Sequence, residues 1–117
     1  MVFRAFAAKR QHPFQSSLGF VLMVLFGVCL ALDICTTNQI LSMGGAELNA
    51  VMVPVVGSPL VHGMLKSGFF VGALAWAAWC EDLIPDAGMT ILSALSGWFL
   101  YVVIFNLYSL SFAPGLI

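Results

Sequence analysis

Charged residues are scarce in this chain of 117 residues: only 8% are Asp, Glu, Lys or Arg, as four basic and five acidic side chains. Soluble domains carry about a quarter charged residues, so this chain has too little polar surface to cover a core in water. The net charge of −1 and the absence of a basic face exclude a nucleic-acid partner. Hydrophobic residues make up 62% of the chain, and the mean hydropathy is +1.06. These values indicate that lipid is the solvent.

Cysteine is also scarce, with Cys29, Cys35 and Cys80 as the three in the chain. They form no Cys-x-x-Cys pair and no Cys/His spacing of a zinc site, so we expect three small, buried apolar residues. A metal site made of Cys29, Asp33 and His62 is chemically conceivable, but no spacing supports it. The sequence therefore predicts neither a metal nor a cofactor.

Catalytic patterns are absent as well. The sequence shows no nucleophile–base pair, no glycine-rich phosphate loop and no carboxylates at catalytic spacing. Ser93 and Ser96 fit helix packing better than nucleophilic chemistry. We therefore expect a protein that is not an enzyme.

Three long apolar stretches predict an all-α integral membrane protein with a single membrane domain. The glycine pair Gly44-Gly45 is expected to end the first stretch, and Pro59 is a favourable first residue for the second. An acidic loop at 81–86 separates the second from the third. The predicted spans are about 17–43, 59–80 and 87–110.

The N-terminal cations Arg4, Lys9 and Arg10 precede the first span and predict its orientation. Positive charge stays on the cytoplasmic side, so three spans place the N-terminus inside and the C-terminus outside a bacterial inner membrane. A cationic start before an apolar run is also typical of a signal peptide. No A-x-A cleavage site follows the run, which favours a retained anchor.

Three polar residues of the spans fall at one depth. At 1.5 Å per residue, Asp33 lies roughly 22 Å into a hydrocarbon core of about 30 Å. Lys66 in the descending second span and Asn106 in the ascending third span reach the same outer half. Thr37 shares a face with Asp33, and His62 shares a face with Lys66, since each pair is one turn apart. His62 lies near the expected interface, where a solvated histidine is the ordinary outcome.

An ionisable group in lipid is costly unless it faces the bundle and finds a partner. Asp33 and Lys66 are the obvious pair, and three interpretations stay open. The pair neutralises itself and fixes the helix register; it builds a binding pocket or ion path; or Lys66 extends to the interface without Asp33.

Small residues recur four apart in the second and third spans. Gly68-x-x-x-Gly72 and Ser93-x-x-x-Gly97 have the spacing that lets helix backbones approach closely in lipid. We interpret these four positions as helix-packing residues.

The polar pattern resembles a family of small three-helix bacterial and archaeal membrane proteins of unassigned function. That family shows an acidic residue and a threonine in helix one, a G-x-x-E-x-N-P-x-M turn, a lysine in helix two and an asparagine in helix three. In this chain Ala50 replaces the proline of the turn, which removes a rigid residue. The resemblance supplies no activity, but it implies that the matching residues act together: Asp33, Thr37, Glu47, Asn49, Lys66 and Asn106.

Two functions are compatible with these features. The first is a non-catalytic accessory or structural subunit of a larger membrane complex, of a bioenergetic or pigment-binding kind. Its partners are other transmembrane subunits and membrane lipids, and its apolar surface offers room for a bound lipid or pigment. The alternative is a small carrier or ligand-binding membrane protein that uses the Asp33/Lys66 cluster.

Overall fold

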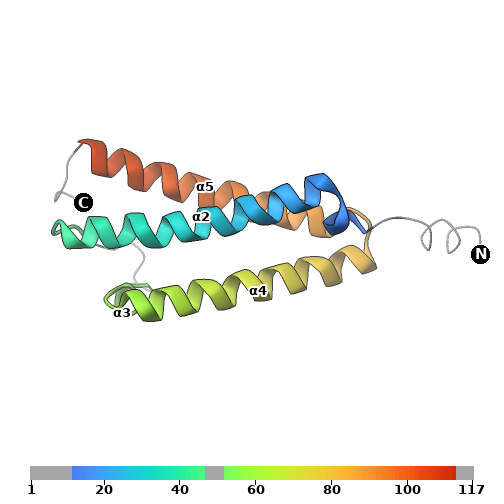
Figure 1. Cartoon of the computed structure of the whole chain (residues 1–117), viewed down its shortest axis with the longest axis horizontal. Helices are drawn as coiled ribbons and strands as arrows, with labels where there is room; N and C mark the ends of the chain where they lie inside the picture. Colours follow the sequence, from blue (N-terminus) through green and yellow to red (C-terminus); the bar gives the residue numbers. More distant parts are fainter. Residues whose placement is uncertain (1–11, 47–51, 113–117) are drawn as a thin grey trace, which may run out of the picture.

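The computed structural model describes residues 12–46 and 52–112. Within them lie three helices that are long and apolar enough to cross a membrane, as the sequence predicts. A single turn of 3-10 helix precedes them and one short helix separates the first two (Figure 1). In chain order the elements are η1 (Pro13–Gln15), α2 (Ser17–Ser42), α3 (Val53–Val56), α4 (Pro59–Leu83) and α5 (Ala87–Phe112).

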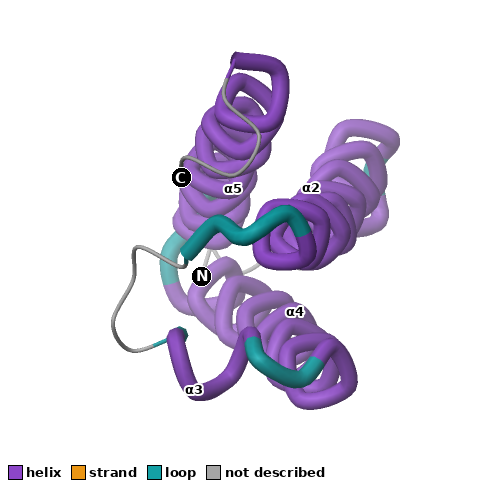
Figure 2. Tube along the Cα trace, turned by 90° about the vertical axis from the view of Figure 1, so that its left-hand side faces the viewer, coloured by secondary structure: helices purple, strands orange, loops and turns teal. Residues whose placement is uncertain are grey.

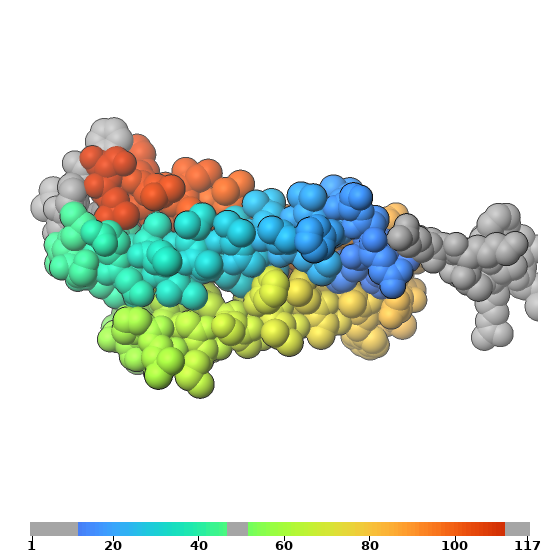
Figure 3. Space-filling view, viewed as in Figure 1, coloured from blue at the N-terminus to red at the C-terminus, as the bar shows by residue number. Residues whose placement is uncertain are grey.

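The three long helices stand at the corners of a triangle when the bundle is viewed along its length (Figure 2). In the side view the C-terminal half of α2 lies between α5 and α4, and the N-terminal half of α2 passes in front of α5 (Figure 3). The helices α4 and α5 converge where the 84–86 loop joins them, and they diverge toward the end that carries α3 (Figure 1). We call these the hairpin end and the α3 end.

Local caps explain where the first helix begins and ends. The Ser16 hydroxyl accepts a hydrogen bond from the Gly19 amide at 3.1 Å and satisfies one free donor of the first turn of α2. At the other end Gly44 has φ +88°, which glycine adopts without steric cost. The Gly45 amide then bonds to the Ile40 carbonyl at 2.9 Å, which closes a Schellman motif. The glycine pair thus ends α2 as the sequence indicates.

The hairpin end differs from the predicted acidic loop. Helix α4 continues to Leu83, because Glu81 is turned inward and only 2% exposed. Its carboxylate accepts hydrogen bonds from the amides of Asp86 at 2.7 Å and Met89 at 3.2 Å. Glu81 therefore caps the start of the next helix, where a negative charge is favourable. Gly88 allows this contact, since a Cβ there would lie 2.8 Å from Cβ of Glu81 and collide with the Ala77 carbonyl.

The core of the bundle is aromatic and lies midway along the helices. Phe26 of α2 is fully buried, with its ring centroid 5.5 Å from Phe70 and 6.1 Å from Phe99. The buried core cluster also contains Cys29, Leu30, Ala73 and Leu92.

The expectation of three buried cysteines is wrong for two of them. Cys29 belongs to the core, whereas Cys80 is partly exposed and Cys35 is exposed. Cys35 follows the inward-facing Asp33 by two residues, which rotates it by about 200° around the helix axis and places it on the outer side of α2.

Candidate functional site

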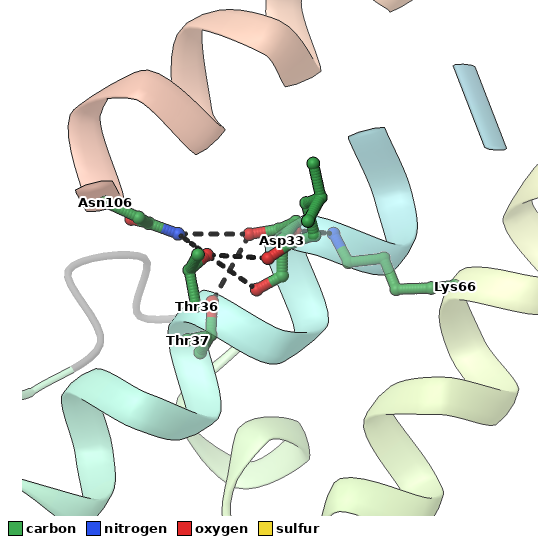
Figure 4. A network of polar contacts seen from close by, with 6 residues as sticks. Asp33, Thr36, Thr37, Lys66 and Asn106 are labelled. Carbon is green, nitrogen blue, oxygen red and sulfur yellow. Dashed lines mark hydrogen bonds and ion pairs between the residues drawn. The ribbon is translucent and has the colours of Figure 1, made fainter. Parts of the chain in front are cut away.

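The polar site lies between the three long helices, toward the α3 end (Figure 4). Its centre is an ion pair in which Lys66 Nζ of α4 lies 2.9 Å from Asp33 Oδ2 of α2. Both side chains are largely buried, with 8% of Asp33 and 13% of Lys66 exposed. The ion pair thus connects two helices in the interior of the bundle, where an isolated charge is costly.

The second oxygen of the Asp33 carboxylate is bonded as well. Asp33 Oδ1 accepts from the Thr37 hydroxyl at 3.2 Å and from the Asn106 amide at 3.4 Å. Asn106 comes from α5, so all three long helices contribute to this one carboxylate (Figure 4). A buried carboxylate is tolerated where such donors and a cation surround it.

Thr36 is a member of the site that the sequence interpretation missed. Its hydroxyl accepts a hydrogen bond from Asn106 Nδ2 at 2.9 Å and donates to the Leu32 carbonyl at 2.7 Å. Because Thr36 is three residues after Asp33, helical spacing alone places it on the same side of α2. The i, i+3 spacing from Asp33 is therefore the feature of the sequence that could have identified Thr36 as a site residue.

Lys66 also touches the aromatic core. Its Nζ lies 4.7 Å from the centroid of the Phe99 ring, within the range of a cation–π contact. Phe99 packs in turn on Phe26 and on Phe69, with ring centroids 6.1 and 5.7 Å apart. The charge of the site therefore rests directly on the packed centre of the bundle.

The structure changes the interpretation of His62. A solvated histidine was expected, but the side chain is 1% exposed. One turn before Lys66, it shares the face of α4 that lines a cavity together with residues of α2 and α5. His62 is thus part of the site rather than of the surface.

A cavity of about 470 Å³ opens beside the ion pair and extends toward the α3 end. Its floor is polar, formed by buried or half-buried side chains, and its α5 side is aromatic, with three rings at least 39% exposed. This volume lies in the ordinary range for a small-molecule pocket. The polar residues are Asp33, Thr37, His62, Lys66 and Asn106, and the aromatic residues are Trp98, Phe99, Tyr101 and Phe105.

The site has a simple chemical character. Within residues 12–46 and 52–112, the cavity lining carries a formal charge at Asp33 and Lys66, and these charges cancel. Among the described residues, no group of three or more His, Cys, Asp or Glu side chains lies close enough to hold a metal ion. The arrangement can hold a polar, uncharged group by hydrogen bonds and an apolar group against aromatic rings. Glu47 and Asn49, the remaining residues of the predicted cluster, lie outside the described residues.

The four predicted packing positions lie on the exposed surface of the bundle that the structure describes. Gly68, Gly72, Ser93 and Gly97 are all exposed. A Cβ added at any of the three glycines would meet nothing within 4 Å.

Comparison with models of protein families, with curated proteins and with solved structures finds no match for this chain. The fold and the site therefore define a class only: an all-α, multi-pass membrane protein with three candidate spans and a buried polar site between them.

Proposed function

We propose that this chain is a non-catalytic, ligand-binding membrane protein whose site is the cavity beside Asp33 and Lys66. The cavity itself carries the proposal, because it joins a polar floor to aromatic walls at the end of the bundle where α4 and α5 diverge. Membrane helices that only neutralise a charge pair have no need of an open space next to it. Mostly apolar pockets with a few convergent polar groups are typical of ligand sites.

The bonding of Asp33 supports a binding role over catalysis. A general base needs a carboxylate that is able to accept a proton from substrate. Here both oxygens are already occupied, by Lys66 on one side and by Thr37 and Asn106 on the other. The carboxylate orients its neighbours, and the Lys66 ammonium is the group that still has protons to donate in hydrogen bonds to a ligand.

Native mass spectrometry of gently extracted protein tests this function. The wild-type chain should retain a small molecule, and Val102→Trp, which fills the cavity from α5, should lose it. Val71→Trp is the matched control, since Val71 is 66% exposed on α4 and is not part of the cavity. Equal retention by the two variants, or no retained molecule in the wild type, would contradict the proposal.

A second candidate is the accessory subunit of a larger membrane complex, and a separate observation favours it. Gly68 and Gly72 on α4, and Ser93 and Gly97 on α5, are exposed, and the three glycines have open space around them. Small residues of this spacing support packing between membrane helices. In this interpretation the partners are other transmembrane subunits in a bacterial inner membrane.

Gly72→Leu tests the accessory role. Since the position is open, the bundle should fold as before, while the chain should separate from its assembly on a native gel. Gly63→Leu is the control: the site is also open, and nine residues place it on the opposite side of α4. If the wild-type chain always migrates alone, the accessory role is wrong.

A further inference from the structure

We propose that the cavity binds the head group of a neutral, membrane-soluble quinone or quinol. This inference deepens the proposed ligand-binding function and rests on it. The charge, the hydrogen-bonding groups and the shape of the cavity each support it.

The charge of the cavity excludes ionic head groups. The carboxylate of Asp33 and the ammonium of Lys66 are 2.9 Å apart and cancel, and the other lining residues among those that the structure describes are uncharged when His62 is neutral. An anionic head group would have to displace Asp33 from Lys66, and a cationic one would have to displace Lys66. In a low-dielectric site either exchange leaves a charge without its partner, which is costly. A neutral ligand leaves the pair intact.

The hydrogen-bonding groups of the cavity fit carbonyl or hydroxyl oxygens on a ring. The Lys66 ammonium has three protons, of which Asp33 takes one on its near side. Both amide protons of Asn106 point to Asp33 and Thr36, so its carbonyl oxygen is left as an acceptor. Lys66 thus suits a quinone carbonyl, and Asn106 suits a quinol hydroxyl. The Tyr101 hydroxyl at the rim can serve either form.

The walls favour a flat ring with an apolar tail. Trp98 and Tyr101 lie next to each other on α5, with ring centroids 5.8 Å apart and planes inclined by 33°. They are 61% and 60% exposed, and Phe105 is 39% exposed, so these rings offer open faces for stacking. Because they also form the lipid-facing rim, a tail attached to the ring can leave the cavity directly into the bilayer. Free fatty acids and phospholipids also have an apolar tail, but their head groups carry charges that would have to displace Asp33 or Lys66 from the ion pair.

The test is an isothermal titration calorimetry experiment in which decylubiquinone is added to the whole chain in lipid nanodiscs. Empty nanodiscs measure the heat of partitioning into lipid, which is subtracted. Palmitate and decylbenzene are the matched probes, the first with a charged head and the second without hydrogen-bonding groups. Decylubiquinone should bind the wild type at least 10-fold more tightly than either probe. Val102→Trp should abolish this preference, and Val71→Trp should keep it.

Two further variants separate the hydrogen bonds from the shape. A hydrogen bond to a charged group contributes about 1.5–3 kcal/mol, so Lys66→Met should weaken decylubiquinone binding by about 10- to 100-fold. If Lys66→Met does not fold, Tyr101→Phe serves, since Tyr101 is 60% exposed and the change removes one oxygen atom. Loss of a neutral hydrogen bond should weaken binding by roughly 2- to 10-fold.

The outcomes distinguish this inference from the proposed function. If palmitate binds better than decylubiquinone and Val102→Trp abolishes it, the cavity is a ligand site but the ligand class is wrong. If decylubiquinone binds equally to the wild type and to Val102→Trp, the ring does not enter the cavity and the inference fails. If no probe binds and no molecule is retained on extraction, the binding function falls as well.

Discussion

The ion pair between Asp33 and Lys66 makes a sharp prediction about stability. Removing one partner of a buried pair typically costs 3–5 kcal/mol, because the remaining charge is stranded. We expect the low end for Lys66→Met, about 3 kcal/mol, since Asp33 keeps the donors Thr37 and Asn106. We expect a similar loss for Asp33→Asn, because Lys66 then retains its charge with only a neutral amide and the Phe99 ring beside it.

The double variant is the decisive measurement. Combining Asp33→Asn with Lys66→Met leaves no charge in the site and nearly preserves the volumes of both side chains, so its stability should lie within about 1 kcal/mol of the wild type. The coupling energy is then about 5 kcal/mol, far above the average of about 0.6 kcal/mol for hydrogen bonds between membrane helices. Unfolding by steric trapping in bicelles gives all four free energies. Thr90→Ala is the control, since its exposed hydroxyl bonds locally, to the carbonyl of Asp86 just before α5. Additive losses in the two single variants would falsify the pairing argument.

Three other predictions concern the hairpin end and the orientation. Glu81→Ala should lower the free energy of unfolding, measured by thermal unfolding, by about 1–3 kcal/mol, because the amides of Asp86 and Met89 lose their acceptor. Glu81→Gln keeps an acceptor oxygen and should lower it less. Equal losses in the two variants would show that the cap is unimportant. Gly88→Ala should destabilise the bundle by about 1–3 kcal/mol through collision with Ala77, whereas Gly63→Ala, in open space, should be neutral or slightly stabilising; a neutral Gly88→Ala would mean that the helices separate there at no cost. Reporter fusions after Gly57 and after Ile117 should both report the external side, because Arg4, Lys9 and Arg10 hold the N-terminus inside; a cytoplasmic signal at either fusion overturns the orientation.

The long helices and part of the site could be predicted because lipid simplifies the problem. Apolar length gives the three spans, and rise per residue places Asp33, Lys66 and Asn106 at one depth without any knowledge of packing. The structure brings those three side chains into contact.

Features that depend on how helices face each other could not be predicted in this way. The burial of Glu81 follows from the close approach of α4 and α5 at Gly88, and an acidic residue before a proline-containing turn is ordinarily expected to be solvated. The aromatic rim of Trp98 and Tyr101 depends on the angle at which α5 leaves α4, and no periodicity in the sequence encodes that angle. Burial of His62 has the same origin.

The closed hairpin end and the divergent α3 end together make helix α4 a lever. Glu81 and Gly88 hold its C-terminal end against α5, while its N-terminal end is separated from α5 by the cavity. Lys66 lies 17 residues from Leu83, a lever arm of about 25 Å at 1.5 Å per residue. A tilt of about 5° around the hairpin end therefore moves Lys66 by roughly 2 Å. Such a tilt away from α2 stretches the 2.9 Å contact to Asp33 beyond ion-pair reach while it widens the mouth between Trp98 and His62. Width of the mouth and closure of the ion pair are thus one mechanical coordinate, so a ligand that enters without tilting α4 leaves the ion pair closed, and one that needs a wider mouth opens it.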